Sequence, residues 1–343
     1  MKRSPQIRPP QIRPPQIRRR AVVLALALGA LLPAARAVHA APATEWPAKP
    51  VRILVGAPPG GTADILARLF AHELQRPLGQ PVVVDYKAGA AGTIAVQSML
   101  SAPRDGYTLL LIQKGIASEV PQAIKVSYDP FKDIVPLVQL TRQGLVLVGN
   151  PGLPAQNLAE LVKYVKANPG KIDIANFGIG LRGHTIGVQF NRLAGLDTGA
   201  VSYRGSPPAL QDIMGGQVSL MFDGPATSMP FIKAGKLRAF AVAFPQRLAA
   251  LPNVPTFAEL GYPDLSEVGW MGLWAAPGLP PAVVSKLREA TLAAMQSPTL
   301  RRKIEELGME VGTPATPDEL ARDVRESYDR QGKVLRSIQF KPE

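Results

Sequence analysis

The sequence predicts an α/β fold, and three observations support this class. Short apolar runs typical of buried strands alternate with longer runs whose apolar residues recur at helical spacing. Several apolar runs end in Gly-rich or Pro-rich turns that lead directly into a helix. The chain has 343 residues, of which 46% are hydrophobic and 19% are charged, so it can bury a sizeable core and does not resemble a disordered chain.

The apolar runs predict the strands, and the helical spacing predicts the helices. In the first expected helix Ile65, Leu66, Leu69, Phe70 and Leu74 recur on one face. The expected strands cover residues 51–55, 82–84, 107–112, 134–140, 145–149, 172–175, 200–203, 217–222, 237–243 and 271–276. The expected helices cover residues 63–75, 92–100, 158–167, 183–193, 281–296, 299–306 and 317–336.

No long polar linker interrupts the chain after residue 45, so two domains would have to be joined by several chain crossings. The sequence changes character near residues 141–144 and 267–269, which are the expected crossing points. We therefore expect a discontinuous domain I, residues 46–142 plus 269–343, and a domain II, residues 143–268.

The net charge of +13 suggests a nucleic-acid partner, but its distribution argues against one. Residues 1–40 contain eight basic and no acidic side chains, so the rest of the chain carries a net charge of only +5. That part has no basic stripe with interleaved aromatic residues. We expect no nucleic acid among the partners.

Residues 1–40 are expected to be a signal peptide that includes a Pro/Arg-rich repeat. Basic residues precede an apolar run over 21–32, and small residues follow it. Val38-His39-Ala40 favours cleavage after Ala40, although residues 35–37 offer a second cleavage triplet. The apolar run is shorter than the roughly 20 residues that span a bilayer, so a retained anchor is the less favoured alternative. The mature protein is expected to be periplasmic.

The sequence contains few side chains of the kinds that act as nucleophiles, general bases or metal ligands. The chain has no cysteine, which excludes disulfides, thiolate metal sites and a cysteine nucleophile. Its three histidines, His39, His72 and His184, are scattered, so no metal site is expected. The sequence patterns of serine hydrolases, zinc proteases and phosphate-binding P-loops are missing. The residues therefore show no catalytic pattern.

A first candidate anion site lies between an expected strand and an expected helix. Its residues are Pro59, Gly60, Gly61, Thr62 and Asp64. The glycines allow a tight turn that exposes backbone amides, and the helix start adds unpaired N–H groups at the positive end of its dipole. A plain turn capped by Thr62 or Asp64 explains the same residues equally well.

A second candidate matches the G-x-G-x-x-G pattern and contains Gly178, Gly180, Arg182 and His184. Dinucleotide binding would need an acid after the next strand, but Asp197 precedes that strand, so a carboxylate-binding loop is favoured. Arg182 can bind a second carboxylate in bidentate fashion, or it is a solvated surface arginine. His184 is more often a packing or capping residue.

Two further candidates follow expected strands. Tyr203, Gly205 and Ser206 form a turn before a helix, for which Ser206 as the N-cap is the alternative explanation. Asp223 ends a strand where α/β proteins bind ligands and can accept a ligand N–H or O–H group. A simple turn before Gly224 is the alternative.

Several short stretches of the sequence are informative when they are taken together and in order. They comprise residues 46–52, 59–64, 79–84, 89–92, 105–110, 168–171, 203–206, 215–217, 221–223, 234–239 and 254–259. Together they resemble the Bug/TctC family, the extracytoplasmic solute-binding proteins of tripartite tricarboxylate transporters. The resemblance implies a two-domain periplasmic-binding-protein fold of the type II, Venus-flytrap kind. It implies a small carboxylate held between the domains by the loops over 59–64, 178–184 and 203–206, without a cofactor.

The chain departs from the family pattern in three loops that would line this cleft. The usual small polar loop is replaced by residues 176–181, and Asp85-Tyr86 and residues 113–116 also differ. Because Phe177, Ile179 and Leu181 are apolar or bulky, we expect a ligand with an apolar or aromatic part.

The resemblance implies a monomeric periplasmic receptor that binds a di- or tricarboxylate, an acidic amino acid or a related acid. It would close about a hinge and deliver the ligand to the membrane components of a tripartite tricarboxylate transporter. Asp223 and the three loops would orient the ligand, with Arg182 as an additional clamp. A ligand-sensing receptor for a membrane sensor kinase is the alternative, and an enzyme such as a hydrolase or isomerase is the least favoured.

Overall fold

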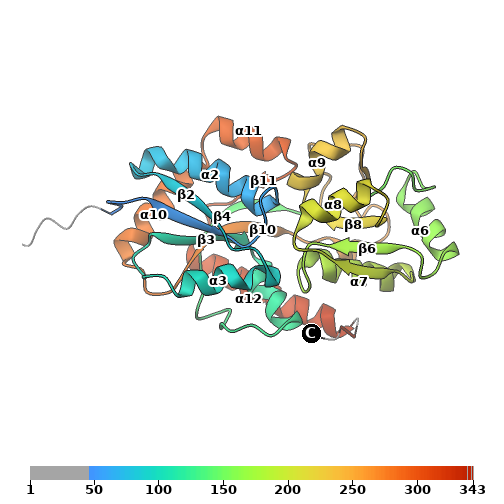
Figure 1. Ribbon diagram of the computed structural model, residues 1–343, viewed down its shortest axis with the longest axis horizontal. Coiled ribbons are helices and arrows are strands. Elements are labelled where there is room, and N and C mark those ends of the chain that lie inside the picture. The colour runs from blue at the N-terminus through green and yellow to red at the C-terminus, as the bar shows by residue number, and fades with distance from the viewer. Residues whose placement is uncertain (1–45, 338, 341, 343) are drawn as a thin grey trace, which may run out of the picture. The chain divides into compact units, whose positions relative to one another are not determined.

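The computed structural model describes residues 46–337, 339, 340 and 342, which fold into two β-sheets flanked by helices (Figure 1). The signal peptide and repeat expected over residues 1–40 lie outside the described residues. The first sheet has the order β11-β4-β10-β3-β1-β2, and the second has the order β7-β6-β8-β5-β9. The strands of the first sheet are β1 (Val51–Val55), β2 (Val82–Tyr86), β3 (Thr108–Gln113), β4 (Val135–Gln143), β10 (Gly269–Ala275) and β11 (Glu310–Val311). Those of the second are β5 (Leu145–Gly149), β6 (Asp173–Asn176), β7 (Gly199–Ser202), β8 (Leu220–Asp223) and β9 (Arg238–Ala243).

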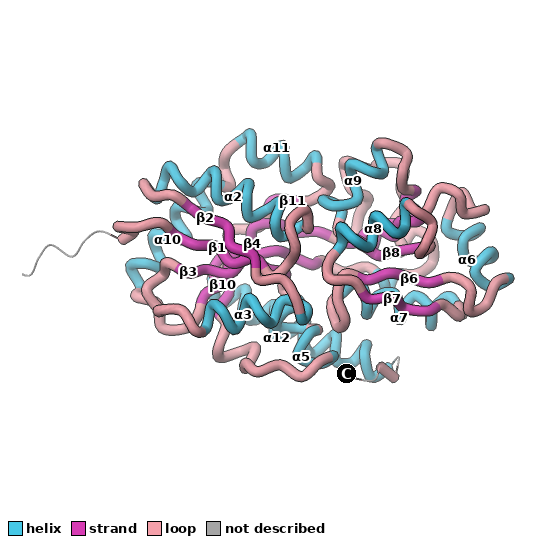
Figure 2. Tube along the Cα trace, in the orientation of Figure 1, coloured by secondary structure: helices cyan, strands magenta, loops and turns pink. Residues whose placement is uncertain are grey.

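Helices cover both faces of the first sheet (Figure 2). The first face is covered by α2 (Thr62–Leu78), α10 (Pro281–Ala294) and α11 (Pro298–Glu306), and the second by α3 (Thr93–Leu100) and α12 (Pro317–Ser337). Two short helices, α4 (Gly115–Ser118) and α5 (Val120–Ala123), follow β3. Alternation along β1 explains this arrangement, because Ile53 and Val55 contact the α2 core whereas Leu54 contacts the α3 core.

The second sheet is covered in the same way. α6 (Leu158–Ala167) and α7 (Arg182–Ala194) cover one face, and α8 (Ser206–Met214) and α9 (Pro225–Lys233) cover the other. The sequence does not predict α9, because two prolines mask its pattern. Pro225 stands at the first helical position, where the missing N–H costs no hydrogen bond, and Pro230 interrupts the helix interior.

β8 begins three residues later than expected. The amide groups of Gln217 and Val218 donate to the carbonyl of Asp212 at the end of α8, so they are not available to the sheet. Apolar character alone cannot distinguish such a turn from the strand that follows it. The strand keeps its expected acid, Asp223, at its carboxyl end.

The chain passes from one sheet to the other at the two predicted crossing points, near residues 141–144 and 267–269. β4 of the first sheet ends at Gln143, and β5 of the second begins at Leu145. The return lies between β9 and β10. Trp46–Glu343 form one compact unit, so a division into domains at these crossings stays a prediction.

Candidate ligand-binding site

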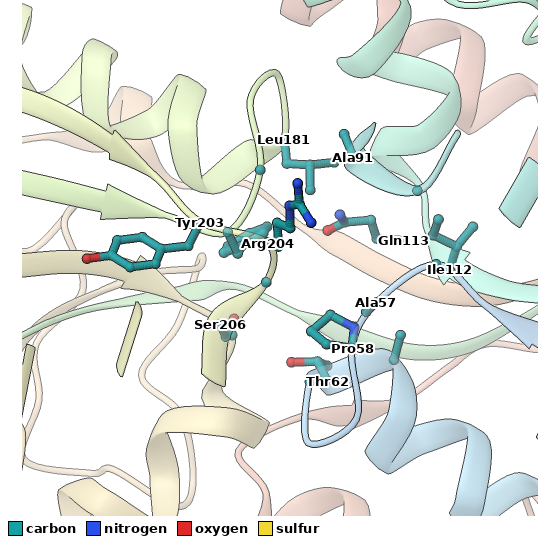
Figure 3. Close-up of a pocket in the computed structure, with 18 of the residues that line it drawn as sticks. Ala57, Pro58, Thr62, Ala91, Ile112, Gln113, Leu181, Tyr203, Arg204 and Ser206 are labelled. Atoms are coloured by element: carbon teal, nitrogen blue, oxygen red, sulfur yellow. The ribbon is translucent and has the colours of Figure 1, made fainter. Parts of the chain in front are cut away.

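A cavity of about 410 Å³ is lined by the segments that follow strands of both sheets (Figure 3). The loops after β1 and β2 and the end of β3 line one side, and loops after β6, β7 and β8 line the other. The volume suits a small organic molecule. The carboxyl ends of parallel strands are where α/β proteins bind ligands, because helix N-termini gather there.

The turn between β1 and α2 offers amide groups to this cavity. Gly61 and Thr62 line it, but the carboxylate of Asp64 accepts a hydrogen bond of 2.7 Å from the Gly60 amide and therefore fills part of the predicted anion site. Asp64 also pairs with Arg68 at 2.7 Å. Within the described part of the chain, the amides of Thr62 and Ala63 have no acceptor, so they remain available to an anion.

The loop between β6 and α7 presents apolar side chains to the cavity. Phe177, Gly178, Ile179 and Leu181 line it. Gly180 instead lies against Ala123, and its amide donates to Nδ1 of His184 at 3.3 Å. The polar members of the predicted G-x-G-x-x-G site are thus turned away from the cavity.

Arg182 is one of the predicted site residues that do not line the cavity. Its Nε lies 3.0 Å from Oε2 of Glu267, and both side chains are mostly buried. The pair borders a second, smaller cavity beside Lys114 and Glu119. The structure therefore places Arg182 in an internal ion pair, neither along the larger cavity nor free in solvent.

The loop between β7 and α8 supplies a different arginine. Figure 3 shows Arg204 directed into the cavity toward Gln113, whereas the ring of Tyr203 points away. The hydroxyl of Tyr203 donates to Asp212 at 2.7 Å. Burial and this hydrogen bond raise the pKa of Tyr203 to about 12. No hydrogen bond or ion pair joins the Arg204 side chain to another residue of the described ranges.

Gly205 allows this loop to lie against the first one. Its φ of +108° suits glycine, and a Cβ there would come within 2.6 Å of the Pro58 ring. Gly205 is also the N-cap of α8, so Ser206 is the first helical residue and not the predicted cap. A side chain at this glycine would force the two loops apart.

Asp223 lies beneath this region and does not line the cavity. It is fully buried, and its two oxygens accept hydrogen bonds from the hydroxyls of Ser206 at 2.5 Å and Thr227 at 2.6 Å. Burial raises the pKa of Asp223 to about 6, although these hydrogen bonds act in the opposite direction. Asp223 therefore ties the start of α8 to α9, and because it is fully buried and does not line the cavity it is not placed to bind a ligand.

We expect Asp223→Asn to remove a pH-dependent part of the stability. Between the ordinary pKa of 3.8 and about 6, the folded chain binds more protons at this site than the unfolded chain. Stability is therefore highest below the ordinary pKa and falls as the pH rises, by about 3 kcal/mol for a change of this size. Asparagine can keep both contacts, because the Thr227 hydroxyl can turn its hydrogen to the carbonyl of Gly224, 2.9 Å away, and accept from the new amide.

The measurement is urea unfolding of both proteins at about pH 4 and about pH 7.5. The wild type should lose stability relative to Asp223→Asn on going to the higher pH. Parallel pH profiles would show that Asp223 ionises in its ordinary range despite its burial.

The predicted site residues thus divide into two groups. The cavity is lined by Gly61, Thr62, Gly178, Tyr203, Gly205 and Ser206. Its lining does not include Pro59, Gly60, Asp64, Gly180, Arg182, His184 or Asp223. The ring of His184 packs against Phe340 with centroids 5.4 Å apart, in agreement with the packing role considered for it.

Several lining residues were missed by the search for chemical motifs. The segment Gly89-Ala90-Ala91-Gly92 lines the cavity, and Ala90 and Ala91 have φ values of 44° and 52°. Such left-handed alanines cost about 1–2 kcal/mol each and concentrate at binding sites. A glycine pair directly after a strand could have identified this loop. Gln143 also lines the cavity, and nothing in its local sequence distinguishes it, whereas Gln113 and Arg204 lie in the loops over 113–116 and 203–206 that the resemblance places at the cleft.

Two features are absent from the described residues. These residues contain no group of three or more His, Asp or Glu residues placed to hold a metal ion. None of their helices has the length and apolar character needed to cross a membrane.

A mixed α/β chain with two sheets and a ligand-sized cavity at their strand ends has the architecture of a periplasmic binding protein. The family model of the tripartite tricarboxylate transporter family receptor, TctC, matches residues 66–340, and the chain belongs to this family. This confirms the resemblance to the Bug/TctC family and the predicted fold class.

Individual relatives agree with this assignment. The chain is 34% identical to protein BugT of Bordetella pertussis over 302 residues, which cover 86% of this chain and 90% of BugT. It is similar to the structure of the periplasmic binding protein BugD, with 32% identity, a TM-score of 0.83 and coverage of 87% and 100% of the two chains. It is equally similar to R. palustris Rpa4515 with adipate, with 31% identity, a TM-score of 0.83 and the same coverage.

Proposed function

We propose that this protein is a periplasmic receptor that binds a small organic carboxylate and delivers it to the membrane components of a tripartite tricarboxylate transporter. The observation that carries this proposal is the cavity of about 410 Å³, which is lined both by residues with unpaired amides after β1 and by Arg204 after β7. The relative with adipate supports a carboxylate as the ligand. The proposal includes export by a signal peptide cleaved after Ala40, a monomeric state and no catalysis.

The two sheets offer a simple mechanism for capture. A ligand that contacts loops from both sheets stabilises the arrangement in which those loops are close together. The crossings at Gln143–Leu145 and between β9 and β10 are the chain segments about which such a closure can take place. The closed arrangement is the one that a membrane partner would recognise.

Thermal unfolding of the chain from Ala41 onward, with a panel of carboxylates, tests the binding. At about 1,000 times Kd a ligand adds about 4 kcal/mol to the stability, which raises the melting temperature by several degrees. 1,6-Hexanediol is the control for adipate, because it keeps the carbon chain and lacks both charges. If no carboxylate raised the melting temperature of well-folded protein, the proposal would fail.

Transport and catalysis need separate measurements. Cells in which the gene for this protein is deleted should take up the identified ligand more slowly than cells that produce the protein. Ligand recovered after long incubation with the protein should be chemically unchanged. Unaltered uptake in the deletion strain would contradict delivery, and a converted ligand would contradict the absence of catalysis.

A further inference from the structure

Few of the described residues that line the cavity are charged. Arg204 is the only charged side chain among the described residues that line it, and no Asp or Glu faces the ligand space. An anion is therefore favoured, and a ligand ammonium group would have no carboxylate partner there. The guanidinium of Arg204 and the amide of Gln113 point toward each other from opposite sides of the cavity (Figure 3). An anion between them can accept hydrogen bonds from both.

The rest of the lining is largely apolar. Side chains from both sheets contribute large apolar surfaces to it: Ile112, Ile124, Leu145, Phe177, Ile179, Leu181 and Met271. The loop after β2 adds Ala90 and Ala91. Against these walls, hydroxyl or amino groups on the body of a ligand would lose their hydration, and the polar side chains of the lining, chiefly Thr62, Gln113, Gln143 and Ser202, can replace it only in part.

The start of α8, the helix nearest Arg204, offers few backbone donors to a ligand. In α8 the first residue, Ser206, is followed by Pro207 and Pro208, which have no N–H group to offer an anion. The hydroxyl of Ser206 already donates to Asp223. On this side of the cavity an anion therefore meets the side chain of Arg204 together with the amides of Gly205 and Ser206, and Arg204 supplies the only positive charge among the described lining residues.

We propose that this pocket selects acids with an apolar, unsubstituted body, aliphatic or aromatic, and that Arg204 is the side chain that binds the carboxylate. This inference rests on the proposed function and names its ligand class. Hydroxylated acids and amino acids are expected to bind less tightly, because the lining has no acid for an ammonium group and few polar side chains for a row of hydroxyls.

Calorimetric titration with matched ligands tests the ligand class. Adipate and galactarate have the same chain length and the same two carboxylates, and they differ by hydroxyl groups on the body. Hexanoate and 6-aminohexanoate differ by one ammonium group. We expect the unsubstituted member of each pair to bind at least about tenfold more tightly. Equal or reversed affinities within the pairs would overturn the inference and leave the proposed function intact, whereas no binding of any acid would contradict the proposed function itself.

Variants test the charged contact and the apolar contact with the ligand separately. Arg204→Gln should weaken adipate binding about 10- to 100-fold, and Arg192→Gln, which changes an exposed arginine outside the cavity, should leave it unchanged. Ile179→Asn should weaken adipate binding and narrow the ratio between adipate and galactarate, which a merely structural role would not do. Neither Arg204 nor Ile179 is fully buried, so the melting temperatures without ligand should stay close to that of the wild type. Adipate affinity that is unaffected by Arg204→Gln would remove Arg204 from the site.

Discussion

Arg182→Met is expected to lower the free energy of unfolding by about 3–5 kcal/mol while leaving the affinity for carboxylates unchanged. The guanidinium lies 3.0 Å from Glu267, and their side chains are only 14% and 16% exposed. Glu267 is held in place by the amide of Gln331 at 2.6 Å. Removal of the arginine leaves this carboxylate in the interior without its cation.

A second acid increases the expected loss. Glu119 is buried beside the pair, and burial is the largest cause that raises its pKa, followed by the charge of Glu267. Arg182 and Lys114 act in the opposite direction. Without Arg182, Glu119 loses one of the two cations that oppose the rise of its pKa, and the other, Lys114, is itself paired with Asp323 at 3.6 Å. Part of the stability loss should therefore disappear at acidic pH as Glu119 becomes protonated.

The measurement is urea unfolding at about pH 7.5, combined with adipate titration at the same pH. The double variant Arg182→Met/Glu267→Gln is the control, and it should recover part of the lost stability because it removes the unpaired charge. The opposite result, unchanged stability with weakened binding, would restore Arg182 to the role of ligand clamp that the sequence pattern suggested.

Phe190→Ala is expected to cost about 3–5 kcal/mol of stability through the cavity that it leaves. The ring of Phe190 in α7 is fully buried and packs edge to face against Phe222, Phe257 and Tyr262, with centroids 5.5–5.9 Å apart. These residues come from β8 and from the segment after β9, so one ring connects a helix, a strand and a loop. Aromatic pairs of this geometry add to the stabilisation from area burial.

Phe190→Leu is the matched control and should lose much less stability, because leucine refills most of the volume. Both variants are compared by urea unfolding without ligand. Since Phe190 does not line the cavity, adipate affinity should be retained wherever the variants remain folded. Equal losses for alanine and leucine would indicate that ring contacts, and not volume, account for the effect.

Most of the secondary structure could be predicted because it depends on local pattern. The strand over Val51–Val55 and the helix over Leu158–Ala167 have the predicted bounds, since each combines a clear period with a defined stop. α9 was missed because Pro225 and Pro230 conceal a helix that packing against the second sheet stabilises.

The candidate site was predicted less evenly. The loops could be located because a strand, a glycine turn and a helix follow one another in the sequence, and Gly61, Thr62, Gly178 and Gly205 do line the cavity. Backbone amides are exposed by local geometry, so a local pattern can find them. The direction of a long side chain depends on partners that lie far away in the sequence.

The two arginines show this most directly. Arg182 follows a Gly-rich loop at a strand end, Arg204 directly precedes the glycine of another such loop, and the local sequences favour Arg182 as the clamp. Glu267, which lies 85 residues beyond Arg182 in the sequence, forms an ion pair with it inside the protein. Arg204 has no such partner in the described ranges and extends into the cavity. Local sequence thus determines the α/β order of elements and the position of the binding loops. Long-range charge pairing and packing determine which side chains a ligand meets, because the competing partners become neighbours only in the folded chain.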